Sequence, residues 1–540
     1  MRELMPPDEP RFAEVAQEMR EGGHWVVPHL AGRVYGDKPP VLFWAMNLAS
    51  LPVGRITATT ARIPSALASL AVLLLTARLG RRLFGSAAAG LAAGVVLMTT
   101  SEFFQRSQWA STDMTLAALT MSAATCWAEA LFGGAEANAG PGHRSWKLRA
   151  GWLAAAMATM TKGPVGLFWA LAWPAAEAAA RGRWRKLAEI FRSSGPLLYV
   201  AVVGGWLLAS EGITGGGYIR DVRRASPMRE HVPQVTSEAR HSPSVEVVHG
   251  GRLSASNQEN DSTALRCCLF LLLEGFVFFS ISSGKRGVYL LPAFPALALL
   301  VSRAFLNAGG LPGLRRAWRD APLVFMVCVG LAGAVAAPFA SRALPGALAS
   351  ITSFSGLPER TASLVAAWGS MTGGLALAGG SVLALMAGRR GRSRRSLAWF
   401  AGGLSILLAL AGTVGGALAS GHQGARAFGA EIAARVPPGS PIAIERGKFE
   451  LILFYSGRKG FEFTGEKDLL KALDGKRAGY ALIERRTFQR LPADPRLAGL
   501  DLLFSGRISD TDYVLLGPAA RQAPPAAHSS LPYEPAALRG

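Results

Sequence analysis

The sequence predicts a polytopic α-helical membrane protein that carries a small C-terminal α/β domain. Half of the 540 residues are hydrophobic and only 17% are charged, whereas charged residues make up about a quarter of a soluble protein. About eleven apolar stretches approach the length of roughly 20 residues that crosses a bilayer. After residue 420 the pattern changes to short helical and strand-like segments, which is typical of a compact α/β domain.

These patterns divide the chain into four regions. Residues 1–60 form a polar segment, 61–419 a transmembrane helical domain, 420–517 the α/β domain, and 518–540 a tail rich in Pro and Ala that we expect to be disordered. The expected transmembrane helices lie at about 61–79, 87–104, 113–132, 150–161, 164–180, 195–210, 267–282, 287–306, 322–340, 366–388 and 396–419.

The basic residues set the expected orientation in the membrane. The net charge is +21, and arginines and lysines cluster in short loops between apolar stretches, such as 78–82, 181–192 and 389–395. Such loops lie on the cytoplasmic side, so this charge indicates orientation, and we expect no nucleic-acid partner. Residues 1–60 and everything after 420 then lie on the outer face. The four cysteines lie in or beside apolar stretches, and we expect no disulfide framework.

One part of the chain conflicts with this orientation. The polar stretches 211–265 and 282–287 both belong outside, yet a single apolar stretch, 267–282, separates them. One crossing is therefore missing. Residues 226–266 show neither helical nor strand periodicity, so we expect coil there. A local frameshift in the gene over 223–266 accounts for this conflict, and so does a genuine divergence.

Several shorter elements are predicted individually. In "RFAEVAQEM", Phe12, Val15, Ala16 and Met19 follow helical spacing, which predicts an amphipathic helix whose apolar stripe faces lipid or the helical bundle. Residues 41–54 resemble a second interfacial segment. In the C-terminal domain we expect helices at 424–436 and 466–475, and strands at 441–445, 451–457, 480–485 and 513–517.

Ionisable residues gather at the ends of apolar stretches on the expected outer face. Carboxylates and cations at one membrane depth indicate a site that binds an anion and moves a proton. Each residue also has a simpler interpretation, because an aspartate can cap a helix and a lysine can extend to lipid headgroups. The residues are Asp8, Glu9, Asp113, Lys162, Lys285 and Arg286.

Four motifs occur in a defined order along the chain: "PPDEPRFAEVAQEM…HWVVPHLAGRVYGDKPPVLFW", "STDMTLA", "TKGP" and "SGKRGVYLLPAFPALALL". In content and order they resemble the aminoarabinose transferase (ArnT) group, which are relatives of protein O-mannosyltransferases with the GT-C glycosyltransferase fold. The resemblance covers about residues 6–306 and, more loosely, the remaining helices and the C-terminal domain. It fails over about 223–266.

The resemblance implies an integral-membrane glycosyltransferase of the bacterial inner membrane, which moves a sugar from a polyprenyl-phosphate carrier to a periplasmic acceptor. In some relatives an acid beside the motif lysine helps to hold a divalent metal, which makes Asp37 and His231 candidates here. The family also has a membrane helix before the acidic segment, so we expect one upstream of Met1. The implied catalytic residues are Asp8 and Asp113, the implied donor-phosphate ligands are Arg11, Lys38, Lys285 and Tyr289, and further candidates are Glu9, Lys162 and Arg286.

Two other functions stay open at this point. A polytopic transporter or lipid flippase has a similar composition, although it usually places ionisable residues near mid-membrane or shows repeated halves. An inactive relative of the enzyme also fits, given the irregular stretch. The sequence leaves the sugar open, and the acceptor could be lipid A, another glycolipid or a protein.

Overall fold

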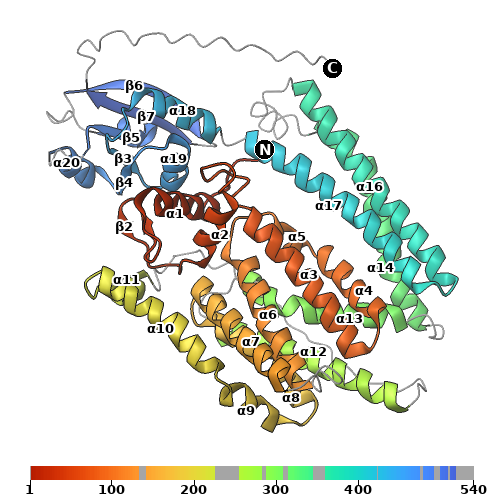
Figure 1. The fold of residues 1–540 in the computed structure, drawn as a ribbon. Coiled ribbons are helices and arrows are strands. Elements are labelled where there is room, and N and C mark those ends of the chain that lie inside the picture. Colours follow the sequence, from red (N-terminus) through yellow and green to blue (C-terminus); the bar gives the residue numbers. More distant parts are fainter. Residues whose placement is uncertain are drawn as a thin grey trace, which may run out of the picture. The chain divides into compact units, whose positions relative to one another are not determined.

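The computed structural model describes residues 2–132, 141–225, 255–281, 287–307, 314–343, 359–421, 424–474, 478–491, 499–508 and 511–518. The chain divides into two compact units, Met1–Gln423 and Gly424–Gly540. Figure 1 shows that the first unit is built mainly from helices and that the second contains a sheet with helices packed on it.

The predicted apolar stretches all form helices. Six described helices are long and apolar enough to cross a membrane, or seven if one bent pair is a single span. The chain is therefore a multi-pass membrane protein. The helices of this region are α3 (Ile63–Phe84), α4 (Ala87–Met98), α5 (Ser101–Ser107), α6 (Thr112–Phe132), α7 (Pro141–Lys162), α8 (Val165–Ala180), α10 (Gly195–Ile213), α12 (Ala255–Ile281), α13 (Phe294–Asn307), α14 (Leu314–Ala343), α16 (Glu359–Arg389) and α17 (Ser393–Gly421).

The stretch at 87–104, predicted as one helix, is instead two helices, α4 and α5, which meet at 75°. Hydroxyl groups lie at the break: Thr99 Oγ1 donates to the carbonyl of Val95 and Thr100 Oγ1 to that of Val96, both at 3.1 Å. Threonines that bond to carbonyls of the preceding turn often bend helices. A hydrophobicity pattern does not show these hydrogen bonds from threonine side chains to the backbone, so the prediction of a single helix was wrong.

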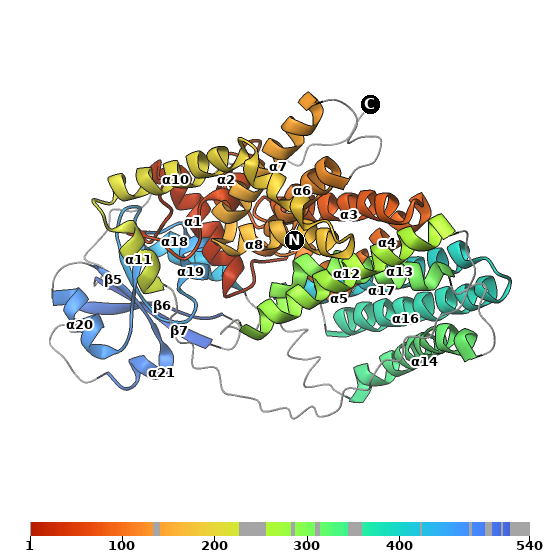
Figure 2. The same cartoon turned by 90° about the horizontal axis from the view of Figure 1, so that it is seen from below.

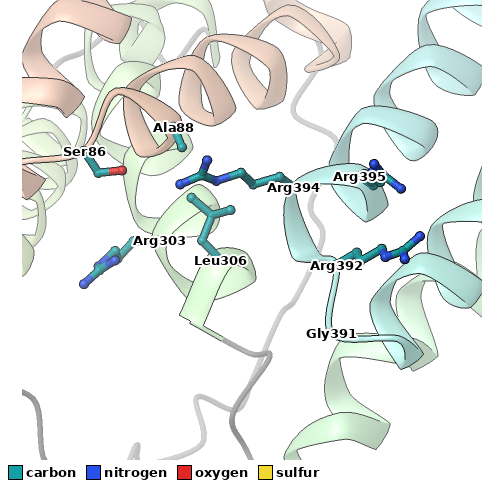
Figure 3. Close-up of a pocket in the computed structure, with 8 residues that line it drawn as sticks. All are labelled: Ser86, Ala88, Arg303, Leu306, Gly391, Arg392, Arg394 and Arg395. Carbon is teal, nitrogen blue, oxygen red and sulfur yellow. The ribbon is translucent and has the colours of Figure 1, made fainter.

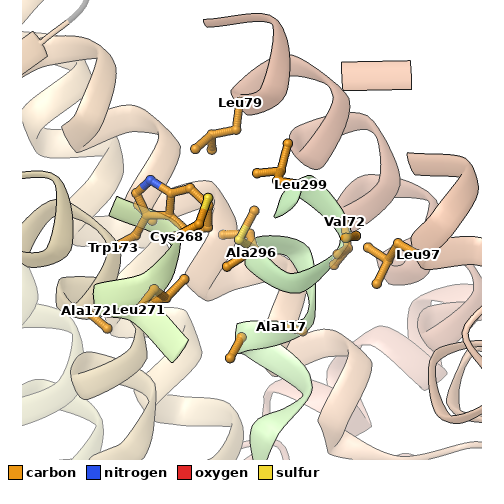
Figure 4. Close-up of a cluster of buried hydrophobic side chains, with 14 of the residues drawn as sticks. Val72, Leu79, Leu97, Ala117, Ala172, Trp173, Cys268, Leu271, Ala296 and Leu299 are labelled. Atoms are coloured by element: carbon orange, nitrogen blue, oxygen red, sulfur yellow. The ribbon is translucent and has the colours of Figure 1, made fainter. Parts of the chain in front are cut away.

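The main core of the first unit lies where α3, α4, α6, α8, α12 and α13 meet (Figure 4). Figure 4 shows Trp173 of α8 beside Cys268 of α12, with Leu79 and Leu299 pointing towards the same interior. Alanines fill much of the remaining space, which lets membrane helices approach closely. This core fixes the ends of α6 and α8 relative to one another.

A second helical group packs through glycines. Helix α16 packs against both α14 and α17 (Figure 2). A Cβ added to Gly330 of α14 would lie 2.6 Å from the carbonyl oxygen of Gly374 of α16. Only a residue without a side chain fits such a contact, so these two backbones touch directly.

The polar segment before the membrane domain folds as helix, hairpin and helix: α1 (Asp8–Gly22), β1 (His29–Leu30), β2 (Arg33–Val34) and α2 (Val41–Ala49). All four residues of the predicted apolar stripe on α1 are buried. The Phe12 ring lies 6.1 Å from that of Phe43 on α2, and Asn47 Nδ2 donates to the Ala16 carbonyl at 2.9 Å. The stripe therefore packs on the protein and not on lipid.

The hairpin turn places the residues that follow it. His29 pairs with Val34 across the ladder, and the two turn residues, Ala31 and Gly32, have φ angles of 55° and 72°. Positive φ at both central positions is the conformation of the tight hairpin turns that match strand twist. The chain reverses here, and Tyr35 N donates to the Pro28 carbonyl at 2.8 Å.

Part of the stretch predicted as coil is helical. Before that stretch, the short helices α9 (Trp184–Arg192) and α11 (Tyr218–Ala225) flank α10. Helix α12 begins at Ala255, so residues 255–266 of that stretch are helical. Arg266 Nε donates to the Ser262 carbonyl at 3.3 Å within this extension. Once the apolar part of α12 packs on α8, the helix continues at little cost into polar sequence that has no periodicity. Residues 226–254 and 282–286 lie outside the described residues.

The second unit contains a five-stranded sheet of order β4-β3-β5-β7-β6. Strands β4, β3 and β5 are parallel, whereas β7 is antiparallel to both β5 and β6. Its elements are α18 (Ala425–Arg435), β3 (Ile442–Glu445), α19 (Phe449–Ser456), β4 (Gly460–Phe463), α20 (Glu466–Asp474), β5 (Tyr480–Glu484), α21 (Arg485–Phe488), β6 (Leu500–Ile508) and β7 (Thr511–Pro518).

One predicted strand of this unit is a helix. Residues 451–457 belong to α19, and Leu451, Ile452 and Leu453 are all buried. A short, continuous apolar stretch is compatible with a buried strand and with a buried helix, and here packing against α18 selects the helix. Gly457 ends it in the left-handed conformation, with φ 59°.

Candidate functional site

Two charged side chains meet where α6 begins and α7 ends. Asp113 lies in the first turn of α6 and is only 8% exposed. Lys162, the last residue of α7, donates from Nζ to Asp113 Oδ1. Its Nζ also lies 4.9 Å from the centroid of the Tyr289 ring, within the range of a cation–π interaction. Three motifs that are far apart in the sequence thus converge on one ammonium group.

This pairing argues against the simpler interpretations of both residues. Lys162 does not extend to lipid headgroups, because its ammonium group is bound to Asp113. Asp113 is not the residue that caps α6, because its backbone N–H donates to Ser111 Oγ at 3.4 Å. Removing the Asp113–Lys162 ion pair from water costs desolvation free energy. Because Ser111 already caps α6, the start of the helix does not require this pair.

A second cluster follows the hairpin. Tyr35 is 8% exposed, and its hydroxyl donates to Asp37 Oδ2 at 3.1 Å. Lys38 Nζ lies 2.8 Å from Asp37 Oδ1 and 3.2 Å from the Asp37 carbonyl. Burial, together with the negative charge of Asp37, raises the pKa of the Tyr35 phenol well above its ordinary value. Tyr35 therefore stays a neutral hydrogen-bond donor.

The first turn of α1 faces this cluster. The charges of Arg11 and Asp8 both act on Tyr35, with Arg11 lowering and Asp8 raising the pKa of the phenol, although burial outweighs either. Asp8 is the first residue of α1, and the N-cap residue, Pro7, forms no side-chain capping bond. The simpler interpretation, in which Asp8 is the N-cap of α1, therefore does not hold.

Glu9 has a different environment from its neighbour Asp8. Its carboxylate is 0% exposed and receives Arg62 Nε at 2.7 Å, Arg62 Nη2 at 2.6 Å, and the backbone N–H groups of Met5 and Ala110 at 2.8 Å. It thus joins α1 to the start of α3 and to the loop before α6. Glu9, a candidate site residue from the sequence, is thus held in the scaffold that joins these elements.

The described residues around Asp37 do not fit a metal ion. Both of its carboxylate oxygens are taken, one by Tyr35 and the other by Lys38. Within the described part of the chain, no group of three or more His, Cys, Asp or Glu side chains could hold a metal. The other candidate metal ligand, His231, lies outside the described residues, as do the expected phosphate ligand Lys285 and the further candidate Arg286.

The sequence of this chain is similar to those of several known proteins. Residues 1–195 match the family model of dolichyl-phosphate-mannose-protein mannosyltransferases. The undecaprenyl phosphate-alpha-4-amino-4-deoxy-L-arabinose arabinosyl transferase 2 of Sodalis glossinidius is 28% identical over 342 residues, which are 57% of this chain and 57% of that protein. The corresponding transferase of an Enterobacter species is 27% identical over 322 residues, 56% and 55% of the two chains. The chain spans a little over half the length of these relatives.

Comparison of structures covers nearly the whole chain. The crystal structure of ArnT from Cupriavidus metallidurans in the apo state superposes with a TM-score of 0.70 and 21% identity, over 95% of this chain and 94% of that one. The chain therefore shares the fold of this ArnT. The structure of the same ArnT bound to undecaprenyl phosphate matches equally well, over 97% and 96% of the chains. The fold expected from the ArnT resemblance is confirmed.

Two residues of this site were not selected from the sequence. Tyr35 is part of the quoted motif "GRVYGDKPP", yet no charge marks it out. Arg62 stands alone just before the apolar stretch of α3, and an isolated arginine at a membrane boundary is normally a headgroup contact. The pairing of Lys162 with Asp113 was missed as well, because 49 residues separate them.

Proposed function

We propose that this chain is a glycosyltransferase of the bacterial inner membrane that moves a sugar from a polyprenyl-phosphate carrier, such as undecaprenyl phosphate, to a lipid or protein acceptor on the periplasmic side. The observation that carries this proposal is the convergence of Asp113, Lys162 and Tyr289 at one end of α6 and α7. The named relatives use an undecaprenyl phosphate-linked aminoarabinose, and an ArnT of the same fold binds undecaprenyl phosphate.

Asp113 is the proposed base. Lys162 holds one oxygen of its carboxylate and so fixes the orientation of the group. The other oxygen then accepts the proton of the acceptor nucleophile as that nucleophile attacks the anomeric carbon of the sugar. A positioned base of this kind contributes about 10²–10⁴-fold in rate. Asp8, held at the first turn of α1 by its neighbour Glu9, is the proposed second acid at the reaction centre.

Lys38 and Arg11 are the proposed cations for the leaving phosphate. Lys38 is 20% exposed and pairs with the more exposed Asp37. A pair this open to water is worth little, so Lys38 can exchange Asp37 for a phosphate at small cost. The phosphate leaves as an anion when the glycosidic bond breaks, and fixed cations at that point stabilise the charge that develops. Tyr289 and Lys285 are proposed to complete the phosphate site, with Arg286 as a further candidate.

Sugar transfer in proteoliposomes tests the proposal. The purified chain is supplied with undecaprenyl phosphate-linked aminoarabinose and with lipid A, and in parallel with other undecaprenyl phosphate-linked sugars and a peptide acceptor. We expect acceptor-dependent release of undecaprenyl phosphate in at least one combination, and its loss in Asp113→Asn. The matched control is Glu102→Gln, because Glu102 forms a simple i,i+4 pair with Arg106 on α5.

The transporter hypothesis makes the opposite prediction. A flippase moves the donor between leaflets without consuming it, so the sugar would stay attached to its carrier in every combination. That result would reject the glycosyltransferase. An inactive relative would neither move nor cleave the donor.

A further inference from the structure

A basic pocket of about 510 Å³ lies at the far end of the membrane domain from the candidate site (Figure 3). Ser86, which lines it, follows the last turn of α3, whereas Arg62, the partner of Glu9, precedes the first turn of the same helix. Helix α3 has 22 residues, which correspond to roughly 33 Å. The two sites are therefore about one bilayer apart. Arginines gather at 78–82, in the last turns of α3, and at 389–395, where α16 ends and α17 begins, which places the pocket on the cytoplasmic side.

The pocket is strongly positive. Four of its eight lining residues are arginines and none is acidic. Figure 3 shows Arg394 of α17 pointing towards Ala88 and Leu306, with Arg303 of α13 on the other side of Leu306 and near Ser86. The Arg303 guanidinium lies 5.5 Å from the Phe84 ring centroid, which helps to hold it in place. Arg392, Arg394 and Arg395 are all exposed, and in Figure 3 Arg392 and Arg395 point away from Leu306.

Apolar surface continues from this pocket along the helices that form it. Leu306 lines the pocket itself. One turn beyond Ala88 on α4 lies Leu91, which is 65% exposed, and one turn beyond Arg395 on α17 lies Trp399, which is 50% exposed. Residues three or four apart share a helix face, so both side chains lie on the side that lines the pocket. Tryptophan is also favoured at the level of lipid headgroups.

We propose that this pocket binds the phosphate headgroup of an anionic phospholipid from the cytoplasmic leaflet, with the acyl chains along the exposed faces of α4 and α17. Basic pockets between membrane helices on this side of the bilayer suit such headgroups, and arginine pairs with phosphate through two parallel hydrogen bonds. Free inorganic phosphate is also an anion, but it has no acyl chains to cover the adjoining apolar faces.

Lipid titration of the purified full chain by native mass spectrometry tests this site. Phosphatidylglycerol and phosphatidylcholine with identical acyl chains are compared. We expect preferential binding of phosphatidylglycerol, and a loss of about 25-fold in its affinity in the double variant Arg303→Gln/Arg394→Gln, at about fivefold for each arginine. The matched control is Arg183→Gln/Arg185→Gln, which removes two exposed arginines from another loop of the same face and should leave affinity within about twofold.

Three outcomes would overturn the proposal: an equal loss in both double variants, no preference over phosphatidylcholine, or displacement of phosphatidylglycerol by inorganic phosphate at a similar concentration. A second measurement needs no variant and so does not depend on folding of the mutants. Phosphatidylglycerol with a photoreactive group at the headgroup should cross-link the unaltered chain at 86–88, 303–306 or 391–395. Labelling spread evenly over the basic loops would reject a defined pocket.

Discussion

Two ion pairs close to the start of α6, Glu9–Arg62 and Asp113–Lys162, differ in how completely their carboxylates are hydrogen-bonded. Glu9 receives four hydrogen bonds, two from Arg62 and two from backbone N–H groups, and is 0% exposed. Asp113 receives Lys162 on one oxygen and keeps 8% exposure. A carboxylate whose bonding capacity is filled is suited to hold a scaffold together, whereas one with a free side can still act on a substrate.

The largest expected effect is on the rate of sugar transfer, and it distinguishes the Asp113–Lys162 pair from the Glu9–Arg62 pair. Asp113→Asn should lower the rate of sugar transfer by about 10²–10⁴-fold, while Asn still accepts a hydrogen bond from Lys162 and keeps the fold. Turnover in proteoliposomes and the midpoint of thermal unfolding are measured together. Near-normal turnover of this variant would mean that the Asp113–Lys162 pair is structural, as Glu9–Arg62 is.

The second expected effect is on thermal stability, and it also distinguishes the two ion pairs. Glu9→Gln replaces one carboxylate oxygen, which accepts one Arg62 N–H and one backbone N–H, with an NH2 group that can accept neither. It also leaves the mostly buried Arg62 without its counter-charge. Breaking a buried pair in this way costs about 3–5 kcal/mol. Thermal unfolding of the variant in detergent should therefore begin well below that of wild type and of Asp113→Asn. Equal unfolding midpoints for the two variants would contradict the proposed difference between the two ion pairs.

The third effect concerns the donor. Lys38→Ala should weaken binding of undecaprenyl phosphate by the amount of one charge-assisted hydrogen bond, about 1.5–3 kcal/mol. Lys162→Ala should instead act mainly on turnover, because its ammonium group is bound to Asp113. Equilibrium binding of a fluorescent undecaprenyl phosphate to both variants gives the comparison. Unchanged binding in Lys38→Ala would remove Lys38 from the phosphate site.

The smallest effect concerns Tyr35 and depends on pH. Burial and Asp37 raise the pKa of the phenol in the folded chain, so the unfolded chain loses this proton at lower pH than the folded one. The stability that the neutral phenol contributes is complete below its ordinary pKa of about 10 and declines as the pH rises above that value. Tyr35→Phe removes this decline. Unfolding midpoints measured from pH 8 to 11 should converge for wild type and variant as pH rises, and parallel curves would contradict the argument.

The amino-acid sequence determined the class of the protein by itself. Composition and stretch length follow directly from the solvent properties of the bilayer, so the helical membrane domain was predictable, and eleven stretches became helices. The stripe of α1 and five of the six elements predicted in the second unit, all except 451–457, follow from periodicity in the same way. The positions of Asp8, Asp113 and Lys38 came from motifs rather than from spacing.

Only the tertiary structure decided what those residues touch. Periodicity reports one helix or strand at a time, and it carries no information about a partner 49 or 53 residues away, as with Lys162 and Asp113 or Arg62 and Glu9. For the same reason residues 451–457 were assigned as a strand: a short apolar stretch satisfies either state, and packing against α18 chose the helix. The chemistry of a buried charge depends on how completely its neighbours satisfy it, and those neighbours exist only once the chain has folded.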